Sequence, residues 1–239
     1  MIKLPTTEEM LKAGMHFGHR TSKWHPKMAP FIFGSRNGVH VIDLVKARKM
    51  LGAALEYLEK AASEGKIILL VGTKEQATKV LKETAIAADV PYVNEGWLGG
   101  SVTNFNIIKK AIKKYITLKT EKETGKLDKY TKKERLDIAR EIARLEKKVG
   151  GLVSLNRVPD IVFIWDIKHE ETAFKEAKKK KLPVVALCDT NVNPTGVDYI
   201  IPGNDDASKT IRLVMALVGE AIKAGKEKTA NQQTVNNKQ

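Results

Sequence analysis

Two histidines and three aspartates are the residues of this chain best suited to metal chemistry. His16 and His19 lie three apart, a plausible spacing for two ligands, and three aspartates follow apolar runs late in the chain: Asp189, Asp205 and Asp206. A structural zinc site usually closes four ligands around the ion, often with thiolates, and the single cysteine, Cys188, ends an apolar run. We therefore expect no metal and no other cofactor. Asp205 is expected to cap the last helix and Asp189 to bond turn amides, while a structural metal near these residues stays open as the alternative.

A second set of chemically capable residues follows a predicted strand. Gly72, Thr73 and Lys74 stand between an apolar run and a predicted helix, where free backbone N–H groups can hold an anion. The chain contains neither the glycine patterns of nucleotide-binding loops nor the G-x-S-x-G motif of serine hydrolases. An ordinary strand-to-helix turn is therefore favoured. The alternative is a metal- or phosphate-dependent enzyme that uses Thr73, Asp189 and Asp205.

The segment 15–28 combines cations with an aromatic ring in a stretch whose glycine and prolines argue against regular structure. Trp24 can stack on an unpaired base beside three phosphate-seeking cations, Arg20, Lys23 and Lys27, which is typical of RNA-binding surfaces. A second aromatic residue, Trp97, stands in a glycine-rich loop that ends at Asn104. Core filling is the alternative for both tryptophans, and capping of the next helix is a further role for Asn104.

Residues 104–151 carry the periodicity of two helices. Apolar residues recur at spacings of three and four in the first half, Phe105, Ile108, Ile112 and Tyr115, and in the second half, Ile138, Ile142, Leu145 and Val149. Such spacing keeps an apolar stripe on one side of a helix, as in a coiled coil. Gly125 and its polar neighbours separate the two runs, so the pattern predicts an antiparallel helical hairpin.

The same hairpin concentrates the positive charge of the chain. Its 15 Lys or Arg and 7 Asp or Glu leave a net charge of +8, against +14 for all 239 residues. Neighbouring lysines repeat one sign, as in Lys109-Lys110 and Lys113-Lys114, whereas a helix shaped for solubility alone would interleave opposite charges. A polyanionic partner is favoured, and a solvated surface is the alternative.

The remaining chain predicts an α/β fold. Continuous apolar runs of strand length alternate with helical patterns on both sides of the hairpin, for example 67–71 before it and 161–165 after it. Such runs mark strands buried on both faces, so we expect a doubly wound, mostly parallel sheet of the flavodoxin or Rossmann type with the hairpin inserted. The expected divisions are a globular domain (1–103 and 152–225), the hairpin (104–151) and a disordered polar tail (226–239).

Composition restricts the class of protein further. One cysteine suits a reducing compartment, and the sequence shows neither a secretory signal nor an apolar run long enough to cross a bilayer. We expect a soluble, cytoplasmic protein. Its excess of positive charge points to a phosphate backbone before an anionic membrane surface, and a free RNA-binding or membrane-surface protein remains an alternative.

Several unusual motifs in order along the chain resemble the family of the second protein of the bacterial-type small ribosomal subunit. They include Ala13–His19, Trp24–Met28, Trp97–Gly100, Leu127–Glu134 and Ile201–Ala207. The resemblance implies a non-catalytic α/β protein with a protruding helical hairpin, bound to small-subunit ribosomal RNA near the head–body junction of a cytoplasmic or organellar ribosome. It also implies neighbouring ribosomal proteins as partners, among them the large OB-repeat RNA-binding protein, with neither a membrane nor a small-molecule substrate.

The chain departs from the family pattern at two places. The position before Trp97 is commonly basic in the family, but Glu95 and Gly96 stand here; and the carboxylate that often follows Asp189-Thr-Asn is replaced by Val192-Asn193. Some relatives hold a metal near this second region, and the replaced carboxylate argues against one here. The expected RNA-binding residues are His16, His19, Arg20, Lys23, Trp24, Lys27, Arg36, Lys74, Trp97, Asn104, Lys109, Lys110, Lys113 and Lys114.

Overall fold

The computed structural model describes residues 3–236 and centres on a five-stranded parallel sheet. The strand order is β5-β4-β6-β7-β8. The strands span β4 (Ile68–Val71), β5 (Tyr92–Val93), β6 (Ile161–Ile164), β7 (Val184–Cys188) and β8 (Tyr199–Pro202). Every neighbouring pair is parallel, and the chain reverses its direction of travel across the sheet between β4 and β6. The predicted α/β fold with a parallel sheet is confirmed.

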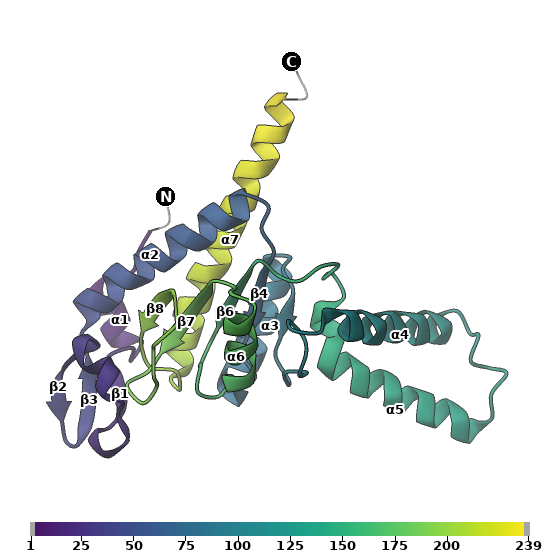
Figure 1. Cartoon of the computed structure of the whole chain (residues 1–239), viewed down its shortest axis with the longest axis horizontal. Coiled ribbons are helices and arrows are strands. Elements are labelled where there is room, and N and C mark those ends of the chain that lie inside the picture. Colours follow the sequence, from purple (N-terminus) through teal and green to yellow (C-terminus); the bar gives the residue numbers. More distant parts are fainter. Residues whose placement is uncertain (1–2, 237–239) are drawn as a thin grey trace.

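Helices cover both faces of the sheet, which explains its uninterrupted apolar strands. Ile68 and Leu70 face a cluster formed with α2 (Leu44–Ser63), α3 (Glu75–Ala87) and α7 (Ser208–Asn236). Leu69 and Val71 point to the opposite cluster, which includes α6 (Glu171–Lys179). Figure 1 shows these layers. The alternation follows from the two-residue period of a strand.

The N-terminal region forms a small antiparallel sheet of order β1-β3-β2. Helix α1 (Thr7–Lys12) begins with a capping box formed by Thr6 and Glu9. Strands β2 (Ile32–Arg36) and β3 (Val39–Ile42) are joined by Asn37 and Gly38, whose φ values of 52° and 74° are those that a tight two-residue hairpin turn requires.

The expectation that residues 15–28 lack regular structure was wrong. Strand β1 (Phe17–Arg20) pairs with the free edge of β3, and short 3₁₀ helices follow at Thr21–Lys23 and Pro26–Phe31. The segment is ordered by contacts far along the chain: the Thr190 side chain accepts a hydrogen bond from the His19 N–H at 2.8 Å, and the Thr190 carbonyl accepts one from the His25 N–H at 2.8 Å.

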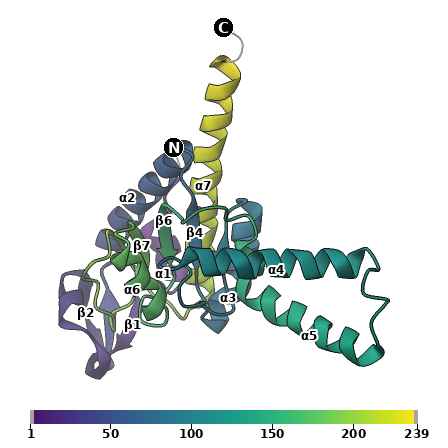
Figure 2. The ribbon, with the colours of Figure 1, turned by 45° about the vertical axis from the view of Figure 1, so that its right-hand side comes forward.

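Two long helices come after β5, the strand at one edge of the sheet. Helices α4 (Phe105–Glu123) and α5 (Lys132–Val149) project from the body side by side, and a short 3₁₀ helix, η3 (Gly150–Leu152), returns the chain to the sheet (Figures 1 and 2). Buried residues between α4 and α5, such as Ile112 and Ile142, belong to the same apolar cluster as Leu69 and Val71 of β4. The apolar contact between these helices is therefore continuous with the core beneath the sheet.

The expected disordered tail is helical as far as it is described. Helix α7 continues without a break to Asn236, and 237–239 lie outside the described residues. Polar contacts support this extension. The Lys228 ammonium pairs with Glu59, and the Thr229 hydroxyl donates a 2.8 Å hydrogen bond to the Ser63 carbonyl at the end of α2. The tail was expected to be disordered because it has few apolar residues to bury. In the structure, polar contacts hold its first part against α2 instead.

Candidate nucleic-acid interface

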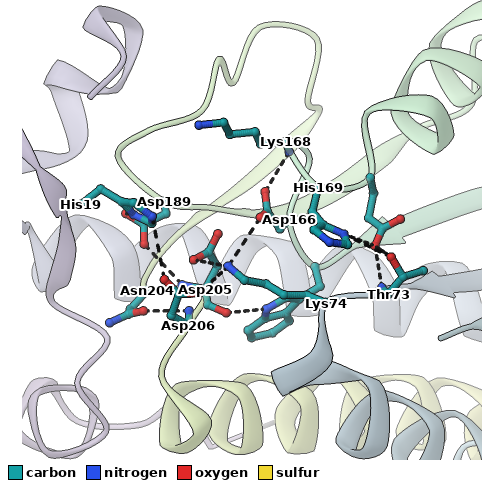
Figure 3. Close-up of polar contacts among 12 residues, drawn as sticks. His19, Thr73, Lys74, Asp166, Lys168, His169, Asp189, Asn204, Asp205 and Asp206 are labelled. Carbon is teal, nitrogen blue, oxygen red and sulfur yellow. Dashed lines mark hydrogen bonds and ion pairs between the residues drawn. The ribbon is translucent and has the colours of Figure 1, made fainter. Parts of the chain in front are cut away.

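A charged cluster occupies the carboxyl ends of the parallel strands. The Lys74 ammonium lies 2.9 Å from Asp205, 2.6 Å from Asp206 and 3.7 Å from Asp166 (Figure 3). Burial alone lowers the pKa of Lys74, but the hydrogen bonds to Asp206 and Asp205 outweigh it and the pKa is raised. The charge of Lys74 is therefore neutralised within the protein, which leaves little of it for the RNA phosphate expected from the sequence.

The small N-terminal sheet contacts this cluster through His19. Its Nδ1 atom lies 3.1 Å from Asp189 and its Nε2 atom 3.8 Å from Asp206. The interaction with Asp189 raises the pKa of His19. Burial, followed by the nearby Asp166 and Asp189 carboxylates, raises the pKa of Asp205 to about 7 even though Lys74 acts in the opposite direction. The cluster thus joins β1 to the ends of β7 and β8.

The expected roles of the late aspartates are only partly confirmed. Asp189 accepts a hydrogen bond from the Thr190 N–H, as expected for a residue that bonds turn amides. Asp205 does not cap the last helix, because its carboxylate binds Lys74; the Asn204 side chain instead accepts bonds from the N–H groups of Asp206 at 2.9 Å and Ala207 at 3.1 Å, just before α7.

The candidate anion position at the start of α3 is filled by the protein itself. The Glu170 carboxylate accepts hydrogen bonds from the Thr73 N–H at 2.5 Å and the Thr73 hydroxyl at 2.6 Å. An external phosphate would compete with a carboxylate that is only 3% exposed. Sequence reasoning missed Glu170 because nothing local marks a helix-start glutamate as a partner for a residue 97 positions away.

Three residues of the cluster approach the spacing of metal ligands. In the described part of the chain, ligand atoms of His19, Asp205 and Asp206 lie within 4.8 Å of one another. The Lys74 ammonium already stands beside both aspartates, so a cation would have to displace it. His16 does not belong to this group; its ring packs against Phe17 at 3.9 Å between centroids, and burial lowers its pKa. These residues do not form a closed ligand set of the zinc type.

The two tryptophans of interest lie in different surroundings. Trp24 is 39% exposed, with its ring centroid 5.1 Å from that of His40. Trp97 packs against the core, and its indole N–H donates a 3.0 Å hydrogen bond to Glu176. Asn104 occupies the N-cap position of α4, but its side chain makes no capping bond. Trp24 thus keeps an open face, while Trp97 is engaged within the protein.

Cations remain accessible at both ends of the molecule. At the small sheet, Arg20, Lys23, Lys27 and Arg36 are exposed, and Lys27 donates a 2.7 Å hydrogen bond to Thr195. On α4, Lys109, Lys110 and Lys113 are exposed, and none forms an ion pair with another described residue. Lys114 turns toward α5 instead and lies 2.7 Å from Glu141. Figure 1 places the small sheet and α4–α5 at opposite ends of the parallel sheet.

Known proteins resemble this chain over most of its length. A family model described as Ribosomal protein S2 matches residues 10–225. The small ribosomal subunit protein uS2 of Psychromonas ingrahamii is 47% identical over 220 residues, which are 92% of this chain and 90% of the relative. The chain belongs to the ribosomal protein S2 family. It is therefore a structural ribosomal protein and not an enzyme, and the enzymatic alternative built on Thr73, Asp189 and Asp205 is rejected.

A helix that crosses a bilayer must be long and predominantly apolar. In residues 3–236, no helix combines the length and apolar character needed to cross a membrane.

Proposed function

We propose that the protein binds small-subunit ribosomal RNA through two basic regions, with α4 and α5 acting as an inserted coiled-coil hairpin. The observation that carries this proposal is the contrast among the hairpin lysines. Lys114 is satisfied by Glu141, whereas Lys109, Lys110 and Lys113 are exposed and have no ionic partner among the described residues. Three adjacent unpaired cations repel one another unless a polyanion neutralises them.

The second region is the surface of the small N-terminal sheet. It presents the exposed cations Arg20, Lys23, Lys27 and Arg36 beside the open ring of Trp24. Cations next to an accessible aromatic ring suit irregular or single-stranded RNA, because the ring stacks on a base while the cations bind the backbone. His16 and His19 help to hold this region in place, because His16 packs against Phe17 and His19 lies beside Asp189.

We place the protein on the small subunit near the head–body junction, in the cytoplasm, and propose that it helps to dock the large OB-repeat ribosomal protein. Its apolar surface supports a protein neighbour at the small sheet: Phe33 is 81% exposed and Phe17 is 52% exposed. Large apolar side chains gathered on one surface are typical of an interaction site. We further propose that the globular domain expected from the sequence is the body that holds both regions.

The test combines co-sedimentation with footprinting. Lys109, Lys110 and Lys113 are changed together to Glu, and a control carries Lys178, Lys179 and Lys180 of α6 and its end changed to Glu, so that the net charge is the same. Wild type and control should stay with small subunits through a high-salt wash and protect two separated RNA segments. The hairpin variant should dissociate and lose one segment. Retention of the hairpin variant with an unchanged footprint would refute the proposal.

A further inference from the structure

The loop that leads into α4 is held by a single carboxylate. Glu176 of α6 is 9% exposed, and its Oε1 atom accepts hydrogen bonds from the Trp97 indole at 3.0 Å and the Gly100 N–H at 2.7 Å. Its Oε2 atom accepts bonds from the Val102 N–H at 3.1 Å, the Thr103 N–H at 3.1 Å and the Thr103 hydroxyl at 3.0 Å. Five donors of one short loop thus converge on one side chain.

We infer that Glu176 is the positioning residue that sets the direction in which α4 and α5 leave the sheet. Thr103 is separated from the first residue of α4 by Asn104 alone, so fixing Thr103 fixes the start of the helix. Asn104 does not cap α4 with its side chain, which leaves Glu176 as the group that orders the helix entrance. Bonds from N–H groups to a carboxylate are roughly twice as strong as bonds between neutral groups.

Charge on Glu176 is consistent with this role. Burial by itself raises the pKa of a carboxyl group, but bonds from Gly100, Trp97, Thr103 and Val102 outweigh burial, and the pKa of Glu176 is lowered. The side chain is thus an anion surrounded by donors at neutral pH. It faces the loop and not the solvent, so it cannot act by touching RNA.

The return path of the hairpin is constrained by packing. After α5, Gly151 passes so close to β5 that an added Cβ would overlap the Tyr92 carbonyl oxygen. One end of the hairpin is therefore tied by hydrogen bonds to α6, and the other end by close contact with β5. Two fixed ends restrict the swing of α4–α5, and this presents Lys109, Lys110 and Lys113 in one orientation before RNA arrives. A pre-organised element loses less entropy on binding.

The inference rests on the proposed function only for its effect on RNA, so the first measurement is of geometry alone. Spin labels are attached to Lys122→Cys near the end of α4 and Lys79→Cys on α3, both exposed positions; the native Cys188 is fully buried and escapes labelling. Pulsed electron resonance then gives the distribution of label distances. The distribution is recorded for wild type, Glu176→Gln, Glu176→Ala and the control Glu171→Gln, which changes an exposed glutamate of the same helix.

We expect a narrow distribution for wild type and Glu171→Gln. For Glu176→Gln we expect a broadened or displaced distance distribution. The new amide places an N–H group opposite donors of the loop, so some of the hydrogen bonds are lost. If Glu176→Ala does not fold, Thr103→Val removes one donor at nearly constant shape and should broaden the distribution to a smaller degree. A Glu176→Gln distribution identical to wild type would overturn the inference, whatever the protein binds.

The second measurement is affinity for small-subunit RNA. Loss of pre-organisation should weaken binding by Glu176→Gln about tenfold, equivalent to about 1.4 kcal/mol, without changing the salt dependence, because no phosphate contact is removed. A broadened distance distribution with unchanged affinity would overturn the link between orientation and binding. Failure of the proposed function looks different: then the lysine reversals of α4 leave the footprint unchanged.

Discussion

Replacing Lys74 by Met tests whether the strand-end cluster is held together by one ammonium group. Methionine keeps much of the length and packing of the lysine stem but removes its charge. Lys74 is 16% exposed and stands among Asp166, Asp205 and Asp206, of which Asp205 is 1% exposed. The change leaves these carboxylates close together without the cation that neutralises them.

The expected cost follows from burial. Removing one partner of a buried ion pair typically costs about 3–5 kcal/mol, because the remaining charge is left unpaired in a poorly solvated place. Asp206 is 52% exposed and can be hydrated again, which reduces the penalty. We therefore expect the free energy of unfolding to fall by about 2–4 kcal/mol at pH 8.

The loss should depend on pH in a defined direction. The pKa of Asp205 is raised to about 7 from its usual 3.8, so the folded state binds a proton that the unfolded state releases. Stability from this group is present at low pH and declines as the pH rises through about 7. Without Lys74, which lowers the pKa of Asp205, the pKa should rise further. At pH 5.5, protonation of Asp205 and of His19, whose pKa is also raised, should reduce the repulsion among the carboxylates. The variant should therefore lose less unfolding free energy at pH 5.5 than at pH 8.

The assay is urea denaturation followed by far-ultraviolet circular dichroism at pH 8 and pH 5.5. Lys79→Met is the control, because Lys79 lies on the same helix, α3, and is exposed; its effect should stay within about 0.5 kcal/mol. A Lys74→Met loss no larger than that of the control at pH 8 would refute the reasoning. A loss that is larger at pH 5.5 than at pH 8 would refute it as well.

Three further predictions concern the hairpin and the metal question. Gly151→Ala should lower the free energy of unfolding by about 1–3 kcal/mol, because the added Cβ meets the Tyr92 carbonyl. The control Gly150→Ala should be nearly neutral, because its Cβ would lie 3.3 Å from the flexible side chain of Glu146. Equal melting temperatures for the two variants would contradict this prediction. Ile142→Asp should lower the unfolding midpoint of the whole chain, because its cluster continues beneath the sheet; a change confined to hairpin helicity would contradict this. Chelation should leave the melting temperature unchanged, and a drop reversed by one equivalent of zinc would make His19 and its aspartates a metal site.

Local patterns predicted much of the fold. The apolar runs at β4, β6 and β7 indicated strands buried on both faces, and the structure places an apolar cluster on each side. Asp43 caps α2 through equally local contacts, because its carboxylate accepts hydrogen bonds from the N–H groups of Val45 at 3.0 Å and Lys46 at 3.1 Å. Such features depend on residues within a few positions of one another, which a sequence displays directly.

Long-range contacts account for what the sequence did not reveal. Glu176 binds Gly100, 76 positions away, and Lys74 meets Asp205 and Asp206 only because parallel strands end at one edge of the sheet. From the sequence, Lys74 was expected to be free to bind RNA, but in the structure it pairs with Asp205 and Asp206. The predicted RNA-binding residues thus divide into exposed groups, among them Trp24 and several cations, and groups already engaged within the protein. This division depends on three-dimensional proximity.

The central claim is that lysines on the outer face of α4 bind RNA phosphates. Its most direct test is the salt dependence of binding to small-subunit RNA, measured for wild type and for Lys109→Ala, Lys110→Ala and Lys113→Ala combined. Each neutralised phosphate contributes about 0.7–0.9 to the slope of log affinity against log salt, so the triple variant should lose about 2–3 units of slope. A control with Lys178, Lys179 and Lys180 changed to Ala should keep the wild-type slope. Equal slopes for the α4 variant and wild type would contradict the account.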